Sequence, residues 1–419
     1  MPGTLDIAMG DRTRQAVAVL GLVGIGAAAA YSIIRRLKPQ GCLPSQPKLA
    51  LEFAAAHGLR LRVVRANGIE IEVAEAGNSS DPLVLLVHGW PEGWGSWKHQ
   101  MTYLAKLDFH VAAPSMRGYG FTSSPVDPKE YGIETLCADA VGLVKVLGHD
   151  FAHLVGHDWG AICSWHFALL RPDVFKTVFC MSVPLGWKVG GSTSTVPRMT
   201  PSEVRPTEAM RKMTGPNFYY ILYHCEVDGR GGCAFSGPAD REYASRAGEM
   251  HDRMFRNPFG EAREARGLSR LKRLLWAKFV APSAMRSSGG FIGRRYPAGE
   301  PPAWAAGHQR EFWLNQYAKS GFIGGVNYYR NFDSNFDATS RLEGARVNQP
   351  SGFLYGSDDV VIRLVQPTWM EDMRALAPRM EDAHVTCVPQ GSHWIMLEKP
   401  DAVNAALGPF LMAYRLLVS

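Results

Sequence analysis

Apolar and polar residues follow two rhythms along most of the chain. Short apolar runs, typical of strands buried in a sheet, alternate with longer segments in which apolar residues recur every three or four positions, as in helices that face a core. The predicted strands cover residues 59–66, 69–74, 83–88, 109–114, 153–155, 177–183, 351–356 and 384–389. The predicted helices cover residues 94–107, 134–148, 159–170, 366–377 and 401–417. This alternation indicates an α/β fold with a mostly parallel sheet and helices on both faces.

The alternation breaks in the middle of the chain. Residues 185–330 are rich in Gly, Pro, Arg and aromatic side chains, and only fragments of a helical pattern remain there. The strand–helix rhythm then returns. The simplest architecture is one α/β core, built from residues 51–184 and 331–419, with residues 185–330 inserted as a mainly helical cap.

The N-terminal 50 residues differ from the rest. Residues 16–34 carry no charged side chain, and a helix of this length, at about 1.5 Å per residue, nearly crosses a hydrocarbon core of roughly 30 Å. Basic residues are in excess after this run, which favours a catalytic domain on the cytoplasmic side. We therefore expect residues 1–50 to form a single-pass membrane anchor and linker, in an endoplasmic-reticulum-like membrane if the organism is eukaryotic. A cleaved signal peptide and a helix that does not span a membrane are the alternatives.

Composition and charge exclude several classes of protein. Hydrophobic residues make up 46% of the chain, which is ample for a large core and excludes a disordered chain. The net charge of +6 is spread over 419 residues, whereas nucleic-acid binding needs clustered Lys and Arg, so we expect no nucleic-acid partner. The seven Cys are scattered without a C-x-x-C pair, and neither H-E-x-x-H nor G-x-x-x-x-G-K-[ST] occurs. We expect no metal and no cofactor.

The most informative segment is Gly156-His157-Asp158-Trp159-Gly160, between a predicted strand and a predicted helix. A nucleophile flanked by small residues in such a sharp turn is typical of hydrolases, and the nucleophile is usually Ser. Here it is Asp158. A carboxylate can displace a leaving group from an sp3 carbon and form an ester with the enzyme, which water then hydrolyses. A plain turn in which Asp158 caps the helix is the alternative.

Two later segments could complete a catalytic triad with Asp158. Asp358 and Asp359 follow the predicted strand 351–356, and His393 follows the last predicted strand. The loops after these strands meet at the carboxyl edge of the sheet, where the His can reach the nucleophile and the Asp can hold the imidazole tautomer. The spacing from the end of the strand favours Asp359 over Asp358, and both remain open.

These motifs together resemble the epoxide hydrolases of the α/β-hydrolase fold. The resemblance covers residues 60–184 and 331–419 and rests on His88-Gly89-Trp90-Pro91-Glu92, Arg117-Gly118-Tyr119-Gly120, Gly156-His157-Asp158-Trp159-Gly160 and His393-Trp394. It implies that epoxides are hydrolysed to vicinal diols, with Asp158 as nucleophile, His393 as the base that activates water and Asp359 as its acid partner. It also implies an oxyanion hole made by the backbone N–H groups of Trp90 and Trp159.

The resemblance further implies two tyrosines of the cap that hydrogen-bond the epoxide oxygen and protonate the alkoxide. Tyr329, in Asn-Tyr-Tyr-Arg, and Tyr220 match the family's two segments, while Tyr219 and Tyr223 are rivals of Tyr220. One departure is that Ser115-Met116 stands where the family often has an Asp. We expect this change to affect the edge of the sheet rather than the chemistry.

Two other functions fit the same residues. A haloalkane or haloacid dehalogenase would use the same ester and the same activated water, with a halide as leaving group. A non-catalytic, membrane-tethered protein could have kept the fold for binding alone. The cap tyrosines favour the epoxide, and a membrane anchor would favour a lipophilic epoxide as substrate, with water as the second reactant.

Overall fold

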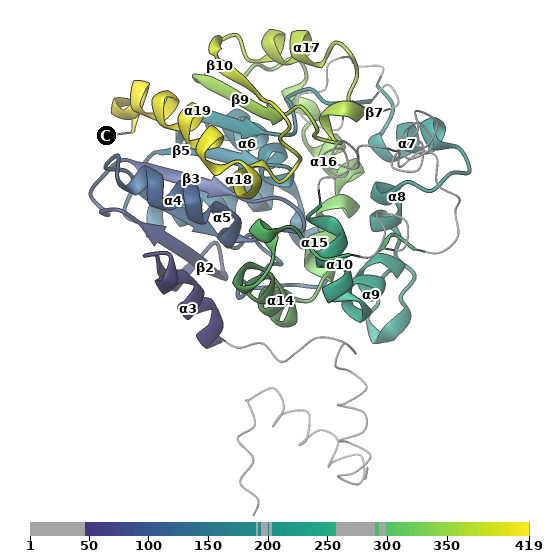
Figure 1. Cartoon of the computed structure of the whole chain (residues 1–419). Coiled ribbons are helices and arrows are strands. Elements are labelled where there is room, and N and C mark those ends of the chain that lie inside the picture. Colours follow the sequence, from purple (N-terminus) through teal and green to yellow (C-terminus); the bar gives the residue numbers. More distant parts are fainter. Residues whose placement is uncertain are drawn as a thin grey trace, which may run out of the picture. The chain divides into compact units, whose positions relative to one another are not determined.

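The central element of the fold is an eight-stranded sheet (Figure 1). The computed structural model describes residues 47–189, 192–193, 200, 203–256, 290–292 and 299–418. The strands are β1 (Arg60–Ala66), β2 (Ile69–Ala76), β3 (Leu83–Val87), β4 (His110–Pro114), β5 (Ala152–His157), β6 (Phe175–Met181), β9 (Ser351–Gly356) and β10 (Met380–Val388), in the order β1-β2-β4-β3-β5-β6-β9-β10. Within this sheet only the β1–β2 and β2–β4 pairs are antiparallel. The predicted, mostly parallel sheet is confirmed.

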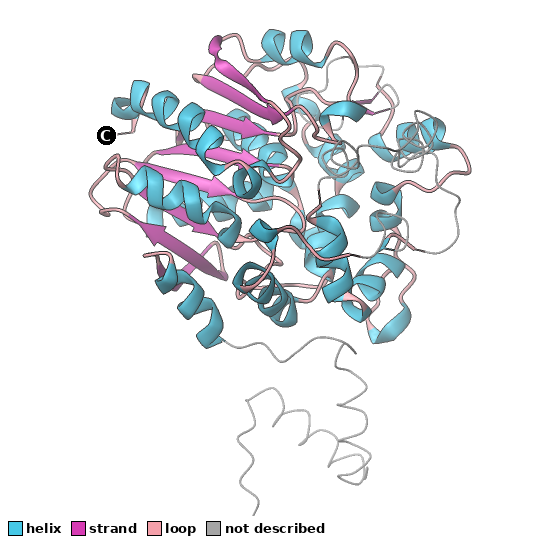
Figure 2. Ribbon diagram, viewed as in Figure 1, coloured by secondary structure: helices cyan, strands magenta, loops and turns pink. Residues whose placement is uncertain are grey.

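Helices cover both faces of this sheet (Figure 2). The flanking helices are α3 (Pro47–Ala56), α4 (Lys98–Ala105), α5 (Ile133–Val146), α6 (Trp159–Leu170), α17 (Trp369–Leu376), α18 (Ile395–Glu398) and α19 (Pro400–Ala413). Alternate residues of β3 point into two hydrophobic cores. Leu83, Leu85 and Val87 pack with α5 and α6, whereas Val84 and Leu86 pack with α4 and α19. A strand with a core on each side must be apolar throughout, which explains its unbroken apolar sequence.

A mainly helical segment is inserted between β6 and β9. Its helices are α7 (Pro206–Thr214), α8 (Tyr220–Cys225), α9 (Pro238–Ser245), α10 (Ala247–Met254), α14 (His308–Ser320), α15 (Ile323–Arg330) and α16 (Phe332–Ala338), with the short hairpin β7 (Lys188–Val189) and β8 (Ser192–Thr193). Single 3₁₀ turns lie at Trp94–Trp97, Pro128–Tyr131, Arg230–Gly232, Ala303–Ala305, Ser340–Leu342, Ile362–Leu364 and Arg415–Leu417. The inserted helices lie beside the carboxyl edge of the sheet (Figure 1).

Hydrogen bonds hold the inserted helices on the core. The Tyr328 hydroxyl of α15 donates to the carbonyl of Arg117 at 2.9 Å, and the Trp313 indole of α14 donates to the carbonyl of Pro91 at 2.5 Å. Both acceptors lie in loops that follow strands of the core. The two helices are therefore fixed relative to the loops that surround the candidate site.

The serine that departs from the family pattern pairs with a carboxylate from the neighbouring strand. Ser115 Oγ donates to Glu72 Oε2 at 2.8 Å, and Glu72 lies on β2 with only 1% of its surface exposed. Its described partners are neutral, and burial raises the pKa of Glu72 above its usual value. A carboxyl group thus lies beside Ser115, but it belongs to Glu72 of β2 and not to the segment Ser115-Met116.

The membrane prediction needs correction. No helix in the described part of the chain is long and apolar enough to cross a membrane. The longest described helices, α5 and α19, have 14 residues each and span about 21 Å, which is less than a hydrocarbon core of about 30 Å. Residues 16–34, on which the prediction rested, lie outside the described residues. The expected linker is also wrong at its end, because α3 begins at Pro47 and packs on the core.

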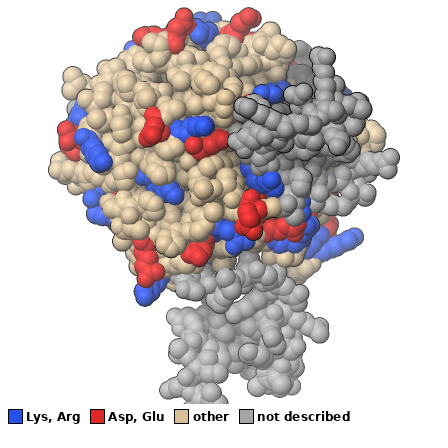
Figure 3. Space-filling model, in the orientation of Figure 1, with Lys and Arg blue, Asp and Glu red and all other residues tan. Residues whose placement is uncertain are grey.

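Charged side chains are mixed on the face shown in Figure 3. Lys and Arg lie among Asp and Glu there and do not gather in one basic patch. Nucleic acid would require a clustered basic surface, and this face does not supply one.

Candidate active site

Asp158 lies in a sharp turn between β5 and α6. Its φ of 52° falls in the left-handed region, which costs energy for a residue with a side chain. The flanking glycines make the turn possible. A Cβ at Gly156 would lie 2.3 Å from the carbonyl oxygen of Gly160, and one at Gly160 would lie 1.9 Å from that of Val87. The turn therefore presents the carboxylate beyond the end of the strand.

Two backbone donors lie at this turn. The Trp90 N–H donates to Asp158 Oδ1 at 2.8 Å. Trp159 is the first residue of α6, so its N–H has no acceptor within the helix. The positive end of the helix also favours an anion at this position. The Trp90 N–H thus contacts the Asp158 carboxylate, and the Trp159 N–H follows Asp158 in the chain. An oxyanion hole formed by the two stays a prediction.

His393 lies between two carboxylates. Its Nε2 is 3.4 Å from Asp158 Oδ2, and its Nδ1 is 3.0 Å from Asp359 Oδ1. Asp359 also accepts the Val361 N–H at 2.8 Å. Asp358, the other candidate acid, instead binds Arg363 at 3.2 Å. The structure brings Asp359 rather than Asp358 to the imidazole.

The three charges shift one another's protonation. Burial lowers the pKa of His393, but Asp359 and Asp158 raise it more, and the result is a pKa of about 10. Burial raises the pKa of Asp158, but the hydrogen bond and charge of His393 bring it below its usual value. The pKa of Asp359 is lowered too, because the charge of His393 outweighs burial. These shifts favour an imidazolium between two carboxylates.

A second buried acid–imidazole pair, Glu92 and His157, contacts the backbone of His393. His157 Nδ1 lies 2.7 Å from Glu92 Oε2, and His157 Nε2 lies 2.8 Å from the carbonyl oxygen of His393. Glu92 also accepts the Gly89 N–H at 3.1 Å. This network fixes the backbone of the base, and the sequence motifs contain its residues without revealing the contact.

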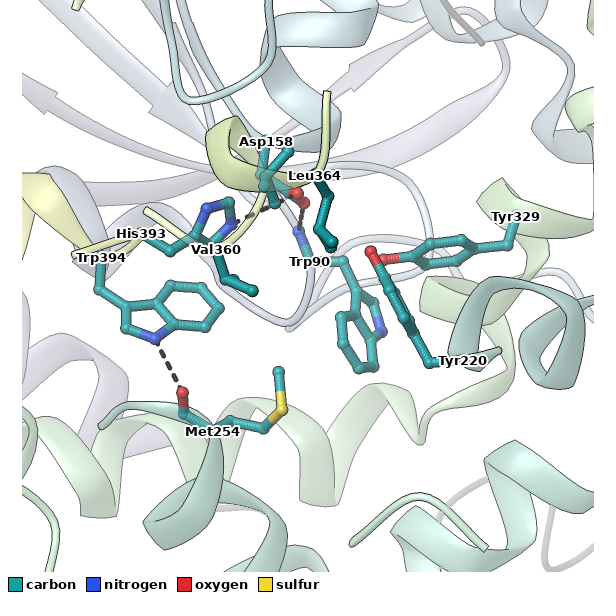
Figure 4. Close-up of a pocket in the computed structure, with 10 residues that line it drawn as sticks. Trp90, Asp158, Tyr220, Met254, Tyr329, Val360, Leu364, His393 and Trp394 are labelled. Atoms are coloured by element: carbon teal, nitrogen blue, oxygen red, sulfur yellow. Dashed lines mark hydrogen bonds and ion pairs between the residues drawn. The ribbon is translucent and has the colours of Figure 1, made fainter. Parts of the chain in front are cut away.

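A pocket opens in front of Asp158 (Figure 4). It is lined by Trp90, Asp158, Tyr220, Met254, Tyr329, Val360, Val361, Leu364, His393 and Trp394. The Tyr220 and Tyr329 phenols lie across the pocket from His393, and their oxygens point to the same region (Figure 4). Their ring centroids are 6.2 Å apart. Of the two rivals of Tyr220, neither lines this pocket, and the Tyr223 hydroxyl donates to Glu242 at 3.0 Å.

Sequence reasoning missed the apolar lining of the pocket. Met254 ends α10, and its carbonyl accepts the Trp394 indole N–H at 2.8 Å. Val360, Val361 and Leu364 follow the acid Asp359. No motif marks Met254, whereas Trp394 could have been found as the neighbour of the base. Within the described ranges, no group of three or more His, Cys, Asp or Glu is placed to hold a metal ion.

The fold is that of an α/β hydrolase, and an aspartate occupies the strand–helix turn in which such hydrolases usually carry a serine nucleophile. The family model for the alpha/beta hydrolase fold matches residues 82–209. Among curated proteins, Epoxide hydrolase A of Mycobacterium tuberculosis is 35% identical over 85% of this chain and 98% of its own length. Epoxide hydrolase 3 of Siraitia grosvenorii is 30% identical over 83% of this chain and 96% of its own length.

Solved structures agree with these relatives. The crystal structure of Epoxide Hydrolase A from Mycobacterium thermoresistibile superposes with a TM-score of 0.71 at 34% identity, covering 84% of this chain and 98% of that one. An epoxide hydrolase from an endophytic Streptomyces gives a TM-score of 0.70 at 30% identity, covering 86% of this chain and 97% of that one. The chain belongs to the epoxide hydrolase family.

Proposed function

We propose that this chain hydrolyses epoxides to vicinal diols through a covalent ester on Asp158. In the first step an oxygen of the Asp158 carboxylate attacks an epoxide carbon, and the bond from that carbon to the ring oxygen breaks. Tyr220 and Tyr329 hydrogen-bond the ring oxygen, and one phenol gives its proton to the alkoxide. Burial holds the pKa of Tyr329 well above its usual value, so this phenol carries the proton at neutral pH.

In the second step water hydrolyses the ester. Formation of the ester removes the negative charge of Asp158, so one of the two carboxylates that raise the pKa of His393 is lost. The imidazolium can then return its proton, through solvent, to the tyrosinate left by the first step, and the neutral imidazole acts as a base toward water, with Asp359 holding its orientation. Water gives one proton to His393 as it attacks the ester carbonyl carbon, and the Trp90 and Trp159 N–H groups stabilise the oxyanion. The bond from this carbon to the alkyl oxygen then breaks, and the diol leaves with the second proton of water and with an oxygen that came from Asp158. This restores the Asp158 carboxylate and the His393 imidazolium.

One observation carries this proposal: the His393 imidazole lies between Asp158 at 3.4 Å and Asp359 at 3.0 Å. This arrangement suits an aspartyl ester followed by His-activated water. The dehalogenase alternative uses the same three residues, but a halide leaves as a stable anion and needs no acid. Two phenols on the opposite wall of the pocket favour the epoxide, whose alkoxide must be protonated.

The lining suggests the class of substrate. On the described residues, Met254, Val360, Val361 and Leu364 face the space in front of Asp158. Apolar surface of this kind favours uncharged substituents. We propose lipophilic epoxides as substrates, and residues 185–330 of the inserted segment as the cap that selects among them.

The test is to trap the ester. In His393→Gln the base is absent but Asp158 is intact, so incubation with excess styrene oxide should raise the mass of the intact protein by one molecule of epoxide. The matched control Asp158→Ala should gain no mass. If His393→Gln remains unmodified while it stays folded, the ester mechanism is wrong.

A further inference from the structure

A buried histidine, His224, lies next to the two tyrosines and has no part in the proposed steps. It follows Tyr220 by four residues in α8, so both side chains lie on one face of the helix. His224 is 0% exposed and is not among the residues that line the pocket. A titratable ring at this depth needs a physical account.

The His224 ring packs against both proposed acids. Its centroid is 4.4 Å from that of Tyr329 and 5.5 Å from that of Tyr220, in edge-to-face geometries of 71° and 82°. The Trp90 ring lies 4.6 Å away. Such aromatic contacts are favourable and directional. His224 therefore contacts three residues that face the reacting atoms without lining the pocket itself.

Two hydrogen bonds fix His224 in this place. Its Nε2 lies 2.6 Å from the hydroxyl oxygen of Tyr243, which belongs to α9 and is 0% exposed. The backbone carbonyl of His224 accepts Nε–H of Arg330 at 3.2 Å. Since Arg330 directly follows Tyr329, the helices that carry the two phenols are tied together at His224. The Tyr243 bond sets the orientation of the ring between them.

We propose that His224, held by Tyr243, is a positioning residue that keeps the Tyr220 and Tyr329 phenols aligned for protonation of the alkoxide. This inference rests on the proposed function, because it requires the tyrosines to act as acids. It concerns the first step alone. His393 and Asp359, which carry out the second step, are on the opposite side of the pocket.

The experiment measures the two steps separately. Rates of ester formation and ester hydrolysis are followed in single turnovers of styrene oxide by wild type, His224→Phe, Tyr243→Phe and the double variant. Each single variant keeps a ring and removes one hydrogen bond, so ester formation should slow roughly fivefold. The double variant should be no slower than either single, because both remove the same bond. Ester hydrolysis should not change.

A matched control separates this effect from the loss of any histidine. His149 is half-buried and its Nε2 lies 2.8 Å from His110 Nδ1. His110 is the first residue of β4 and His149 precedes β5, so the pair lies at the amino ends of these strands, whereas Asp158 follows the carboxyl end of β5. His149→Phe also loses a ring-to-ring hydrogen bond and should leave both rates unchanged. If His224→Phe does not fold, Tyr243→Phe, which removes only a hydroxyl, tests the same bond.

Three results would overturn the inference. Ester formation at the wild-type rate in Tyr243→Phe would show that the bond does not matter. Equal slowing of both steps, with a lower Tm, would show a merely structural role. Strictly additive effects in the double variant would show that the two residues act separately. If wild type forms no ester at all, the proposed function fails and this inference falls with it.

Discussion

The core side and the cap side of the pocket hold their polar groups in different ways. On the core side, Asp158, His393 and Asp359 form a chain of charges in which each neighbour is within 3.4 Å. On the cap side, Tyr220 and Tyr329 are neutral phenols packed against other rings. Charge is therefore concentrated at the proposed nucleophile and base, and the proposed proton donors lie in apolar surroundings.

This difference indicates how the two steps are divided. Buried charges are tolerated when they are paired, and their pKa values then depend on each other. A substitution on the core side should change both the protonation of the triad and the rates of the chemical steps. A change on the cap side should alter how well the alkoxide is protonated while the charges of the triad stay as they are.

The largest effect on ester hydrolysis is expected at Asp359, and almost none is expected at the adjacent acid Asp358. Asp359→Asn should slow ester hydrolysis by about a thousandfold or more, because the imidazole loses its oriented partner. Asp358→Asn, one residue away, removes a contact with Arg363 and should change hydrolysis less than about twofold. Quenched-flow measurement of the ester checks both, and equal losses in the two variants would contradict the assignment.

A second pair tests the cap side. Tyr329→Phe should slow ester formation by at least about tenfold, because one of two proton donors is lost. Its neighbour Tyr328 donates to the Arg117 carbonyl instead, so Tyr328→Phe should cost about 1 kcal/mol of unfolding free energy and leave ester formation unchanged. Stopped-flow kinetics and thermal unfolding distinguish the two outcomes. If ester formation slowed in Tyr328→Phe and not in Tyr329→Phe, the assignment of Tyr329 as the proton donor would be wrong.

A titration tests the coupling of charges. The pKa of His393 is about 10 because two carboxylates face it. Asp158→Asn removes one charge, as the ester does, and should lower this pKa. Imidazole NMR signals followed from pH 6 to 11 check the change, with Tyr329→Phe as the control that should keep the wild-type value. An unchanged pKa in Asp158→Asn would contradict the proposed release of the His393 proton on ester formation.

The smallest effect concerns a carboxylate with neutral described partners. Burial raises the pKa of Glu72 from 4.5, so its contribution to stability is full below about pH 4.5 and is lost as pH rises through the folded value. Glu72→Gln mimics the protonated form. The substitution should raise the unfolding free energy by about 1 kcal/mol at pH 8. Near pH 4 the variant and the wild type should have the same unfolding free energy. Denaturant unfolding at the two pH values checks this, and destabilisation at pH 8 would contradict it.

Sequence patterns predicted most of the core side. The strands and the turn around Asp158 follow from local rules, namely apolar runs and close glycine contacts, so the ends of neighbouring strands could be placed together in advance. The spacing after β9 favoured Asp359, and the turn there sends Asp358 toward Arg363. The membrane prediction came from a charge-free apolar run and the basic residues that follow it, and this run lies outside the described residues.

The cap side was less predictable for a physical reason. Its residues meet through packing between helices that are distant in the sequence, such as α8 with α15 and α10 with the loop after β10. No periodicity marks Met254 as part of the pocket or His224 as a neighbour of Tyr329. Tyr220 could be favoured over Tyr219 and Tyr223 only by resemblance, because all three lie within five consecutive residues at the start of α8.

The most direct test of the account is the fate of the water oxygen. Wild-type enzyme in excess is given one turnover of styrene oxide in heavy-oxygen water and then digested and weighed, with Asp158→Ala alongside. We predict one heavy oxygen in the peptide that contains Asp158, ordinary oxygen in the diol, and no diol from the variant. Heavy oxygen in the diol with none in the peptide would mean that water attacks the epoxide directly, and would contradict the ester on Asp158.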